Sequence, residues 1–249
     1  MKPPTPRSTG TRLYCDLRLS PGAEIVLPDA AARHAVTVLR LQVGDTLDLF
    51  NGEGGEYRAS LVAASKRETR VRLIAFHAAE RESPLEITLA LGISAGERMD
   101  YSLQKATELG VTAIQPLATE RSLVKLAGAR ADKRLQHWQR VVIAACEQCG
   151  RNRVPAVAPV QTLFAYLAAV ERNVRLLMLS PHAATPLKRV PPAARVLLLI
   201  GAEGGLAPAE FQAAEASGFE PVSLGPRILR TETAPVAALA VLQALWGDM

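Results

Sequence analysis

The sequence predicts an α/β protein composed of a small N-terminal β-barrel and a larger domain with a parallel sheet. Three observations lead to this fold class. Short segments of alternating polar and apolar residues fill the first 75 positions, apolar strands alternate with helical segments from residue 85 onward, and a polar stretch closed by Pro84 separates the two patterns. Strands that alternate with helices form parallel sheets covered by helices on both faces.

The N-terminal part opens with a proline-rich lead-in, residues 1–11, which we expect to be a disordered tail. Period-two alternation predicts strands at 12–19, 46–50, 57–62 and 69–75, and one helical segment is expected at 29–40. The glycines of Asn51-Gly-Glu-Gly-Gly55 supply the positive φ angles that a hairpin loop needs. About five short strands that close on one another make a barrel that often binds nucleic acid, so we assign residues 12–76 to an RNA-binding domain.

The polar segment 77–84 is short and ends at a proline, which predicts a linker. Residues 85–249 then form the second domain, with strands expected at 85–91, 111–117, 174–179, 196–200 and 219–224. Helices are expected at 100–109, 130–149, 163–170, 208–217 and 234–246. The last helix is apolar almost all round, which predicts that it is fully buried.

Basic residues are concentrated in one part of the chain. The net charge is +5, and residues 119–153 alone carry eight basic and three acidic side chains, a surplus of five. This concentration suits a polyanionic partner such as nucleic acid, although a solvated helix face would have the same composition. No apolar run approaches the roughly 20 residues that cross a bilayer and no secretory signal is visible, so we expect a cytoplasmic protein without membrane contact.

The cysteines give no reason to expect a disulfide framework or a metal. The chain has three cysteines, Cys15, Cys146 and Cys149, and an odd, small number in a chain of this size argues against a framework of disulfides. Cys146 and Cys149 close a helical pattern instead of opening a helix after a strand, and no second cysteine pair or histidine cluster completes a zinc site. We therefore expect no metal.

Three predicted strands end in loops that can converge at the carboxyl edge of the sheet, where α/β proteins bind ligands. These loops are 179–182, 201–205 and 225–231. The second, Gly201-Ala-Glu-Gly-Gly205, lacks both the G-x-G-x-x-G spacing of dinucleotide-binding proteins and the Gly-Lys-Ser/Thr ending of P-loops. Adjacent glycines let main chain approach a ligand closely, which favours a purine or sulfonium cofactor held by backbone groups.

These loops also carry a family resemblance. Together with Gln104–Gly110, Glu120–Ser122 and Glu147–Gln148, the segments Ile200–Gly205 and Leu224–Ala234 resemble the ribosomal RNA small subunit methyltransferase E family. Val38-Leu-Arg40 followed by Gly44-Asp45 is similar to the small PUA-like barrel of that family. The resemblance implies a SPOUT-type domain with a C-terminal trefoil knot, S-adenosyl-L-methionine as the cofactor and a homodimer. It also implies methylation of N3 of a uridine in 16S rRNA, either free or in the small ribosomal subunit.

The resemblance further implies which residues form the site. Arg230 is expected to stabilise the negative charge that develops on the uracil carbonyl oxygens as the N3 proton leaves, with Glu232 orienting Arg230 or assisting proton removal. A carboxylate near a helix start is also favoured by the helix dipole, so Glu232 can equally serve the helix alone. The residues expected to bind the cofactor, mostly through main chain, are Leu179, Gly201, Glu203, Gly204, Gly205, Leu224, Gly225, Ile228 and Leu229.

The residues expected to contact RNA are Arg33, His34, Arg40, Lys105, Arg121, Arg151 and Arg153. Guanidinium groups in loops that border the site, such as that of Arg121, are suited to holding phosphate, whereas Lys105 and Glu108 lie three residues apart on a helix and can simply pair. Two other functions stay open. One is a non-catalytic RNA-binding or ribosome-assembly factor, which would have no use for the ligand loops, and the other is a SPOUT methyltransferase that acts on a different RNA.

Overall fold

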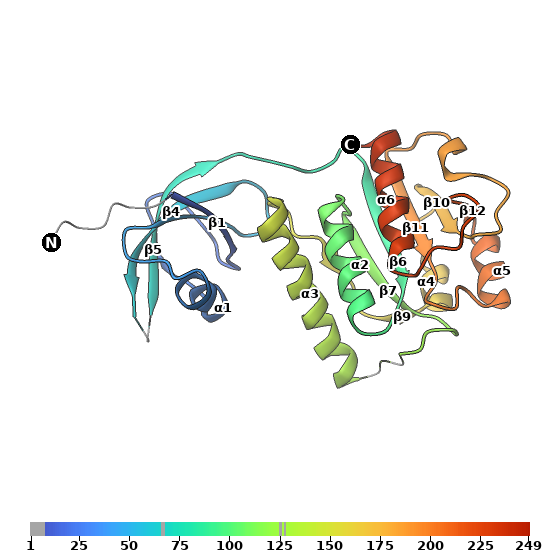
Figure 1. The fold of residues 1–249 in the computed structure, drawn as a ribbon, viewed down its shortest axis with the longest axis horizontal. Coiled ribbons are helices and arrows are strands. Elements are labelled where there is room, and N and C mark those ends of the chain that lie inside the picture. The colour runs from blue at the N-terminus through green and yellow to red at the C-terminus, as the bar shows by residue number, and fades with distance from the viewer. Residues whose placement is uncertain (1–7, 66–67, 125, 127) are drawn as a thin grey trace. The chain divides into compact units, whose positions relative to one another are not determined.

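The computed structural model describes residues 8–65, 68–124, 126 and 128–249, and the chain divides into two compact units (Figure 1). Unit 1 consists of the chain up to Glu82 together with Cys146–Val154, and unit 2 consists of Ser83–Ala145 and Pro155–Met249. None of the helices in the described part of the chain combines the length and apolar character needed to cross a membrane.

Unit 1 contains a five-stranded sheet of order β1-β3-β4-β5-β2. The strands are β1 (Ser8–Tyr14), β2 (Glu24–Val26), β3 (Thr46–Phe50), β4 (Glu56–Ala64) and β5 (Thr69–His77). β1 pairs parallel to β3, and the other pairs are antiparallel. Alternate residues of the strands, such as Leu47 and Leu49, are fully buried and pack in one core with Ala31 of the helix α1 (Asp29–Arg33).

Three expectations for unit 1 are wrong: the tail 1–11, the strand 12–19 and the helix 29–40. Residues 8–11 belong to β1 and not to a tail, and Cys15–Leu19 lie outside that strand; the rest of the expected tail, 1–7, falls outside the described residues. The pairing of β1 is irregular between Ser8 and Arg12, which obscures its alternation in the sequence. The expected helix 29–40 consists of α1 and a π-helical segment η1 (His34–Val38), and it ends before Arg40, whose φ of 56° is left-handed.

Unit 2 is built on a parallel sheet of order β12-β10-β11-β6-β7-β8, with β9 also paired to β7. Its strands are β6 (Glu86–Gly92), β7 (Ala113–Ala118), β8 (Ala156–Val157), β9 (Gln161–Thr162), β10 (Arg175–Leu179), β11 (Arg195–Ile200) and β12 (Glu220–Val222). The parallel sheet expected from the alternation of strands and helices is therefore confirmed. The trefoil knot stays a prediction.

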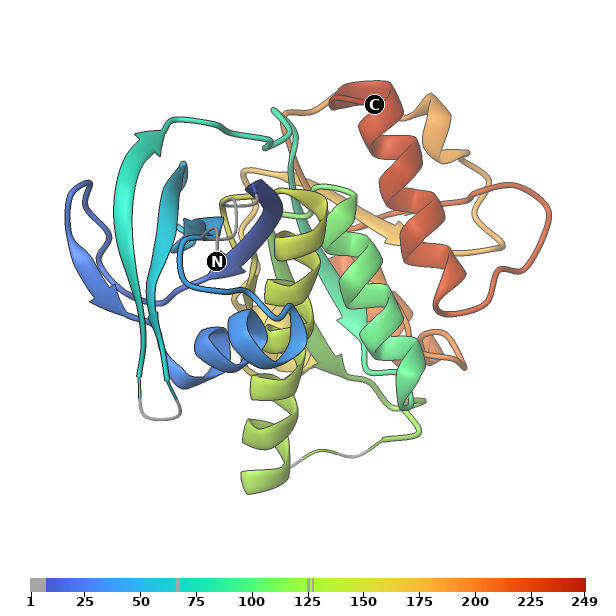
Figure 2. The ribbon, with the colours of Figure 1, turned by 60° about the vertical axis from the view of Figure 1, so that its left-hand side comes forward.

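Helices cover both faces of this sheet. They are α2 (Glu97–Glu108), α3 (Ala129–Cys149), α4 (Leu163–Ala168), α5 (Pro208–Ala216) and α6 (Thr233–Trp246), with a 3₁₀ turn η2 (Leu187–Arg189). α2 and α6 pack together on one face, and α4 and α5 pack together on the other (Figures 1 and 2). Leu197 and Leu199 join the core beneath α4 and α5, while Leu198 between them is also fully buried, as a strand covered on both faces requires.

The expectation that α6 is fully buried is wrong. Ala238, Leu239 and Leu242 are fully buried, but Leu245 is 47% exposed, and a half-buried stripe runs along the same helix. The stripe consists of Val236, Ala237, Ala240 and Val241. An apolar helix loses contact with water on all sides only when a second surface covers it, and the described part of this chain covers one side.

Candidate active site

One cavity in unit 2 brings together all nine residues that the sequence predicts to bind the cofactor. It has a volume of about 240 Å³ and lies where β10, β11 and β12, which are neighbours in the sheet, reach their carboxyl ends. Seven further residues line the cavity. Ser180, Pro181, Ile200 and Ala234 come from the ends of β10 and β11 and the start of α6, and the others are Ala202, Arg227 and Thr231. The location is the one at which open α/β sheets bind ligands.

The glycines of the 201–205 loop allow this close packing. A Cβ atom on Gly201 would lie 2.7 Å from the carbonyl carbon of Gly205, and a Cβ on Gly92 at the end of β6 would lie 2.3 Å from the amide nitrogen of Ala202. Gly205 has a φ of 70°, and its amide donates to the carbonyl of Ala202 at 2.8 Å, which closes a tight turn. The loop therefore rests directly on the main chain of β6 and presents backbone groups to the cavity.

Glu203 is the acidic side chain of this loop, and its two oxygens differ. Oε1 accepts a hydrogen bond from the amide of Ala95 at 2.8 Å and lies 3.5 Å from Nη1 of Arg98. Oε2 is buried and has no hydrogen-bond partner among the residues that the structure describes. A buried, unpaired carboxylate oxygen at a cavity wall is an acceptor available to a ligand donor such as a hydroxyl or ammonium group.

The segment 94–98, which comprises the end of the connection after β6 and the first two residues of α2, also reaches the loop before α6. The hydroxyl oxygens of Ser94 and Thr231 are 3.0 Å apart, and Nε of Arg98 lies 3.9 Å from Oε2 of Glu232. Sequence reasoning missed Ser94, Arg98 and Thr231. Their positions in the sequence could have indicated them, because Ser94 and Arg98 follow a predicted strand of the same sheet and Thr231 lies beside Arg230.

Arg230 and Glu232, the expected catalytic residues, lie at the entry to α6. Arg230 is exposed and does not line the cavity, and its carbonyl accepts from the amides of Thr233 and Ala234, both at 2.9 Å. No ion pair holds its guanidinium among the described residues. The side chain of Glu232 caps no backbone amide of α6, so its direct contact is with Arg98 and its effect on the helix is limited to the dipole.

Arg121 lies beside the 201–205 loop, which is the loop expected to bind the cofactor. Its Nη1 donates to the carbonyl of Gly204 at 2.9 Å, and it lines a second cavity of about 510 Å³ that shares Gly204 and five other residues with the first. The buried carboxylate of Glu210 fixes this arrangement, because it accepts from the amides of Glu120 at 2.8 Å and of Ala207 at 2.9 Å. Lys125, in the same basic segment, falls outside the described residues.

Lys105 is the other expected RNA contact of unit 2, and it is engaged within its own helix. Its Nζ donates to both carboxylate oxygens of Glu108 at 2.8 and 2.9 Å. The hydrogen bond to Glu108 raises the pKa of Lys105. The pairing considered from the spacing is thus present, and a contact with RNA would compete with it.

In unit 1, Arg33 and Arg40 are exposed and His34 has a carboxylate neighbour. Nδ1 of His34 lies 3.5 Å from Oε2 of Glu147, whose other oxygen accepts from the amide of Tyr14 at 2.9 Å. Burial raises the pKa of Glu147. His34 therefore has Glu147 of the same unit as its neighbour, and the two arginines are exposed where phosphate can reach them.

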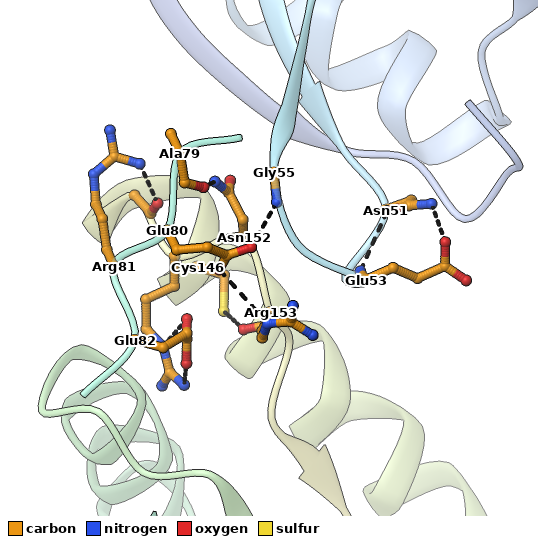
Figure 3. Close-up of polar contacts among 12 residues, drawn as sticks. Asn51, Glu53, Gly55, Ala79, Glu80, Arg81, Glu82, Cys146, Asn152 and Arg153 are labelled. Atoms are coloured by element: carbon orange, nitrogen blue, oxygen red, sulfur yellow. Dashed lines mark hydrogen bonds and ion pairs between the residues drawn. The ribbon is translucent and has the colours of Figure 1, made fainter. Parts of the chain in front are cut away.

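Arg151 and Arg153 differ sharply in their surroundings, and Figure 3 labels Arg153 together with Glu80 and Glu82, the carboxylate neighbours of the two arginines. Arg151 is only 4% exposed, and its Nε donates to Oε1 of Glu82 at 3.1 Å while Nη2 donates to Oε2 of the same carboxylate. The side chain of Arg153 is 56% exposed and lies 3.6 Å from Glu80. Arg153 can reach an RNA phosphate as it stands, whereas a contact by Arg151 would require its buried ion pair to open.

The described residues contain no group of three histidine, cysteine, aspartate or glutamate side chains placed to hold a metal ion. The three cysteines are free thiols. Burial raises the pKa of Cys15 to about 11 and that of Cys146 to about 12, so both thiols are protonated at neutral pH.

Comparisons with known proteins relate both units to RNA methyltransferases. A family model described as an RNA methyltransferase domain matches residues 81–243, and one described as an RNA methyltransferase PUA domain matches residues 27–74. The Ribosomal RNA small subunit methyltransferase E of Synechocystis sp. is 38% identical over 90% of this chain and 74% of its own length. The PUA match confirms the predicted class of the N-terminal domain.

Two solved structures match nearly the whole chain, and both contain S-adenosylmethionine. The Ribosomal RNA small subunit methyltransferase E of Neisseria gonorrhoeae is 43% identical with a TM-score of 0.90, and the match covers 96% of this chain and 99% of that one. A methyltransferase of Legionella pneumophila is 40% identical with a TM-score of 0.93, and the match covers 98% of this chain and 100% of that one.

Proposed function

The chain belongs to the ribosomal RNA small subunit methyltransferase E family, and we propose that it transfers a methyl group from S-adenosylmethionine to N3 of a uridine in 16S rRNA. The observation that carries this proposal is the cavity in which the loops after β10, β11 and β12 converge. Relatives that match nearly the whole chain were solved with this cofactor. The 16S rRNA substrate and the N3 position follow from the family resemblance.

The residues of the cavity fit this cofactor. Leu179, Leu224, Ile228 and Leu229 supply apolar surface, and the glycine loops supply backbone donors and acceptors for a purine and a ribose. The unpaired Oε2 of Glu203 provides one further acceptor. When bound, the cofactor supplies an electrophilic methyl group on a sulfonium.

The residues of this chain then have to orient the uridine, provide for removal of its N3 proton, and stabilise the negative charge that this removal leaves on the uracil. Much of the catalysis in such an in-line displacement comes from orientation. We assign to Arg230 the stabilisation of the negative charge on the uracil carbonyl oxygens, because its guanidinium is exposed at the entry to α6 and no acid among the described residues pairs with it. Glu232 is assigned to proton removal or to the orientation of Arg230.

Exposed arginines provide for binding of the RNA backbone. Arg121 borders the cofactor loop, and Arg33, Arg40 and Arg153 are exposed in unit 1. Neutralisation of phosphates by such groups makes affinity fall with salt. We expect replacement of Arg121 or Arg153 by alanine to weaken RNA binding and to reduce the dependence of the affinity on salt concentration. An unchanged salt dependence would mean that these side chains do not contact RNA phosphates.

The test of the proposed reaction is Arg230→Ala, with Arg172→Ala as the control. Arg172 is an exposed arginine just before β10, at the opposite end of the strand from the cavity. Loss of one charge-stabilising donor lowers turnover by about 10²–10³-fold. We expect this loss for Arg230→Ala in a mass-spectrometric assay of methyluridine in 16S rRNA, with cofactor affinity in calorimetry nearly unchanged.

Three outcomes would contradict parts of this proposal. Normal turnover of Arg230→Ala would remove Arg230 from the reaction. Cofactor binding without methylation of any RNA would favour the non-catalytic assembly factor. Methylation confined to another RNA would keep the enzyme class and change the substrate.

We also propose that the protein is a homodimer that uses α6. The family resemblance implies a dimer, and the half-buried stripe of α6 with Leu245 is an apolar surface suited to a second copy. Leu245→Glu places a charge on this surface, so we expect it to lower the molecular mass in light scattering toward that of a monomer. An unchanged mass would remove α6 from the interface.

A further inference from the structure

We infer that Arg98 is a positioning residue that holds the cofactor loop (201–205) and the catalytic loop before α6 (225–232) in register through Glu203 and Glu232. The inference rests on the proposed methyltransferase function, because it gives Arg98 a part in the site where that reaction takes place. Nη1 of Arg98 lies 3.5 Å from Oε1 of Glu203, and its Nε lies 3.9 Å from Oε2 of Glu232. The two carboxylates come from different loops, one after β11 and one before α6.

The position of Arg98 is set by its own local structure. Gly96 has a φ of 52° and a ψ of −127°, a conformation that residues with a side chain rarely adopt, and α2 starts at the next residue. This turn also directs the amide of Ala95 to Glu203 at 2.8 Å and the hydroxyl of Ser94 to within 3.0 Å of that of Thr231. The segment 94–98 thus contacts each of the two loops through at least two groups.

Charge explains why an arginine is needed here. Glu203 and Glu232 have side chains that are only 16% and 23% exposed, and in the described part of the chain Oε2 of Glu203 has no hydrogen-bond partner. Within the described residues, Arg98 is the one cation that lies within 4.0 Å of either carboxylate. Without it, two partly buried negative groups would face the same site with no counterion, and each would move toward solvent.

The guanidinium also has the right shape for two partners. Nη1 and Nε lie on different edges of one rigid, planar group, so a single side chain meets two carboxylates at once. The ammonium group of lysine is a compact point charge on a flexible chain. A lysine at this position would keep the charge but would not fix the distance between the loops.

The test consists of two double-mutant cycles, with all variants first shown to be folded. In the first, kcat is compared for Arg98→Gln, Glu232→Gln and the double variant. We expect Arg98→Gln to lower kcat at least tenfold in the wild-type background and less than twofold in the Glu232→Gln background, because its effect passes through Glu232. Arg98→Lys should recover only part of the loss. Glu97→Gln, an exposed neighbour, serves as the control for changes at the start of α2.

The second cycle measures the dissociation constant of S-adenosylmethionine by calorimetry and needs no RNA. Arg98→Gln should raise it several-fold in the wild-type background and leave it unchanged in the Glu203→Gln background. Equal effects of Arg98→Gln in both backgrounds of both cycles, or no effect at all, would overturn the inference. If the wild type binds the cofactor but methylates no RNA, the proposed function fails, while the second cycle still decides the part of Arg98 that concerns Glu203.

Discussion

Replacement of Gly92 by alanine tests how closely the cofactor loop depends on the main chain beneath it. Gly92 is buried at the end of β6, and a Cβ there would lie 2.3 Å from the amide nitrogen of Ala202 and 2.7 Å from the carbonyl carbon of Gly201. Both atoms belong to the backbone and cannot rotate away. To restore an ordinary contact of roughly 3.5 Å, the loop would have to move by about 1 Å.

Two consequences follow from that displacement. Overpacking of a well-packed interior costs about 1–3 kcal/mol of unfolding free energy. A displacement of about 1 Å at a site that works by orientation can cost about 100-fold in rate. We therefore expect Gly92→Ala to lower the midpoint of urea denaturation and also to reduce methyl transfer by about two orders of magnitude.

Gly204→Ala is the matched control for stability. A Cβ on Gly204 would lie 3.0 Å from Cβ and 3.2 Å from Cδ of Arg121, which is exposed, so that Cδ can rotate away and Cβ needs to shift by only a few tenths of an ångström. Its cost to the free energy of unfolding should stay within about 0.5 kcal/mol, as for most surface substitutions. Equal denaturation midpoints for Gly92→Ala and Gly204→Ala would refute the steric argument.

The other predictions concern unit 1. Arg151→Ala should lower the free energy of unfolding by about 2 kcal/mol or more, because it removes the buried ion-pair partner of Glu82. Arg153→Ala, at an exposed ion pair, should lower it by less than about 1 kcal/mol. Equal midpoints of urea denaturation for the two variants would contradict this difference. Burial raises the pKa of Cys146 from its ordinary 9.0 to about 12, so a thiol reagent at pH 8 should modify Cys149 before Cys146. In the unfolded chain Cys146 loses its proton near pH 9, but in the folded protein it keeps the proton up to about pH 12. The free energy of unfolding should therefore fall as the pH rises above about 9.

The longer strands and helices of both units could be predicted in their order, except β2, because hydrophobic periodicity is a local property. It gave the strand at 46–50 with its observed bounds and the long helix at 130–149 within one residue. Local patterns fail where pairing is irregular or a strand is very short, as in β1 around Gly10 and in the two-residue β8 and β9. Strand order in the sheets depends on contacts between distant segments, which periodicity does not encode.

The candidate site shows the same limit. Glycine-rich loops after apolar strands pointed to the cavity at the carboxyl edge, because that location follows from the fold class. Arg98 was missed because its role depends on two carboxylates far along the chain. Arg151 and Arg153 look alike in sequence, and only packing shows that one is enclosed with Glu82 while the other faces solvent.

The discontinuity of unit 1 affects any attempt to study this unit, which we propose binds RNA, on its own. A fragment that stops at Glu82 lacks Cys146–Val154 and therefore two hydrogen-bond acceptors. The side chain of Asn152 accepts from Nη2 of Arg12 at 2.6 Å, and the side chain of Glu147 accepts from the amide of Tyr14. Such a fragment would expose a guanidinium and a strand amide that the intact protein satisfies. RNA affinities measured on it would describe a damaged module, whereas grafting 146–154 onto its end through a short flexible linker would return the missing acceptors.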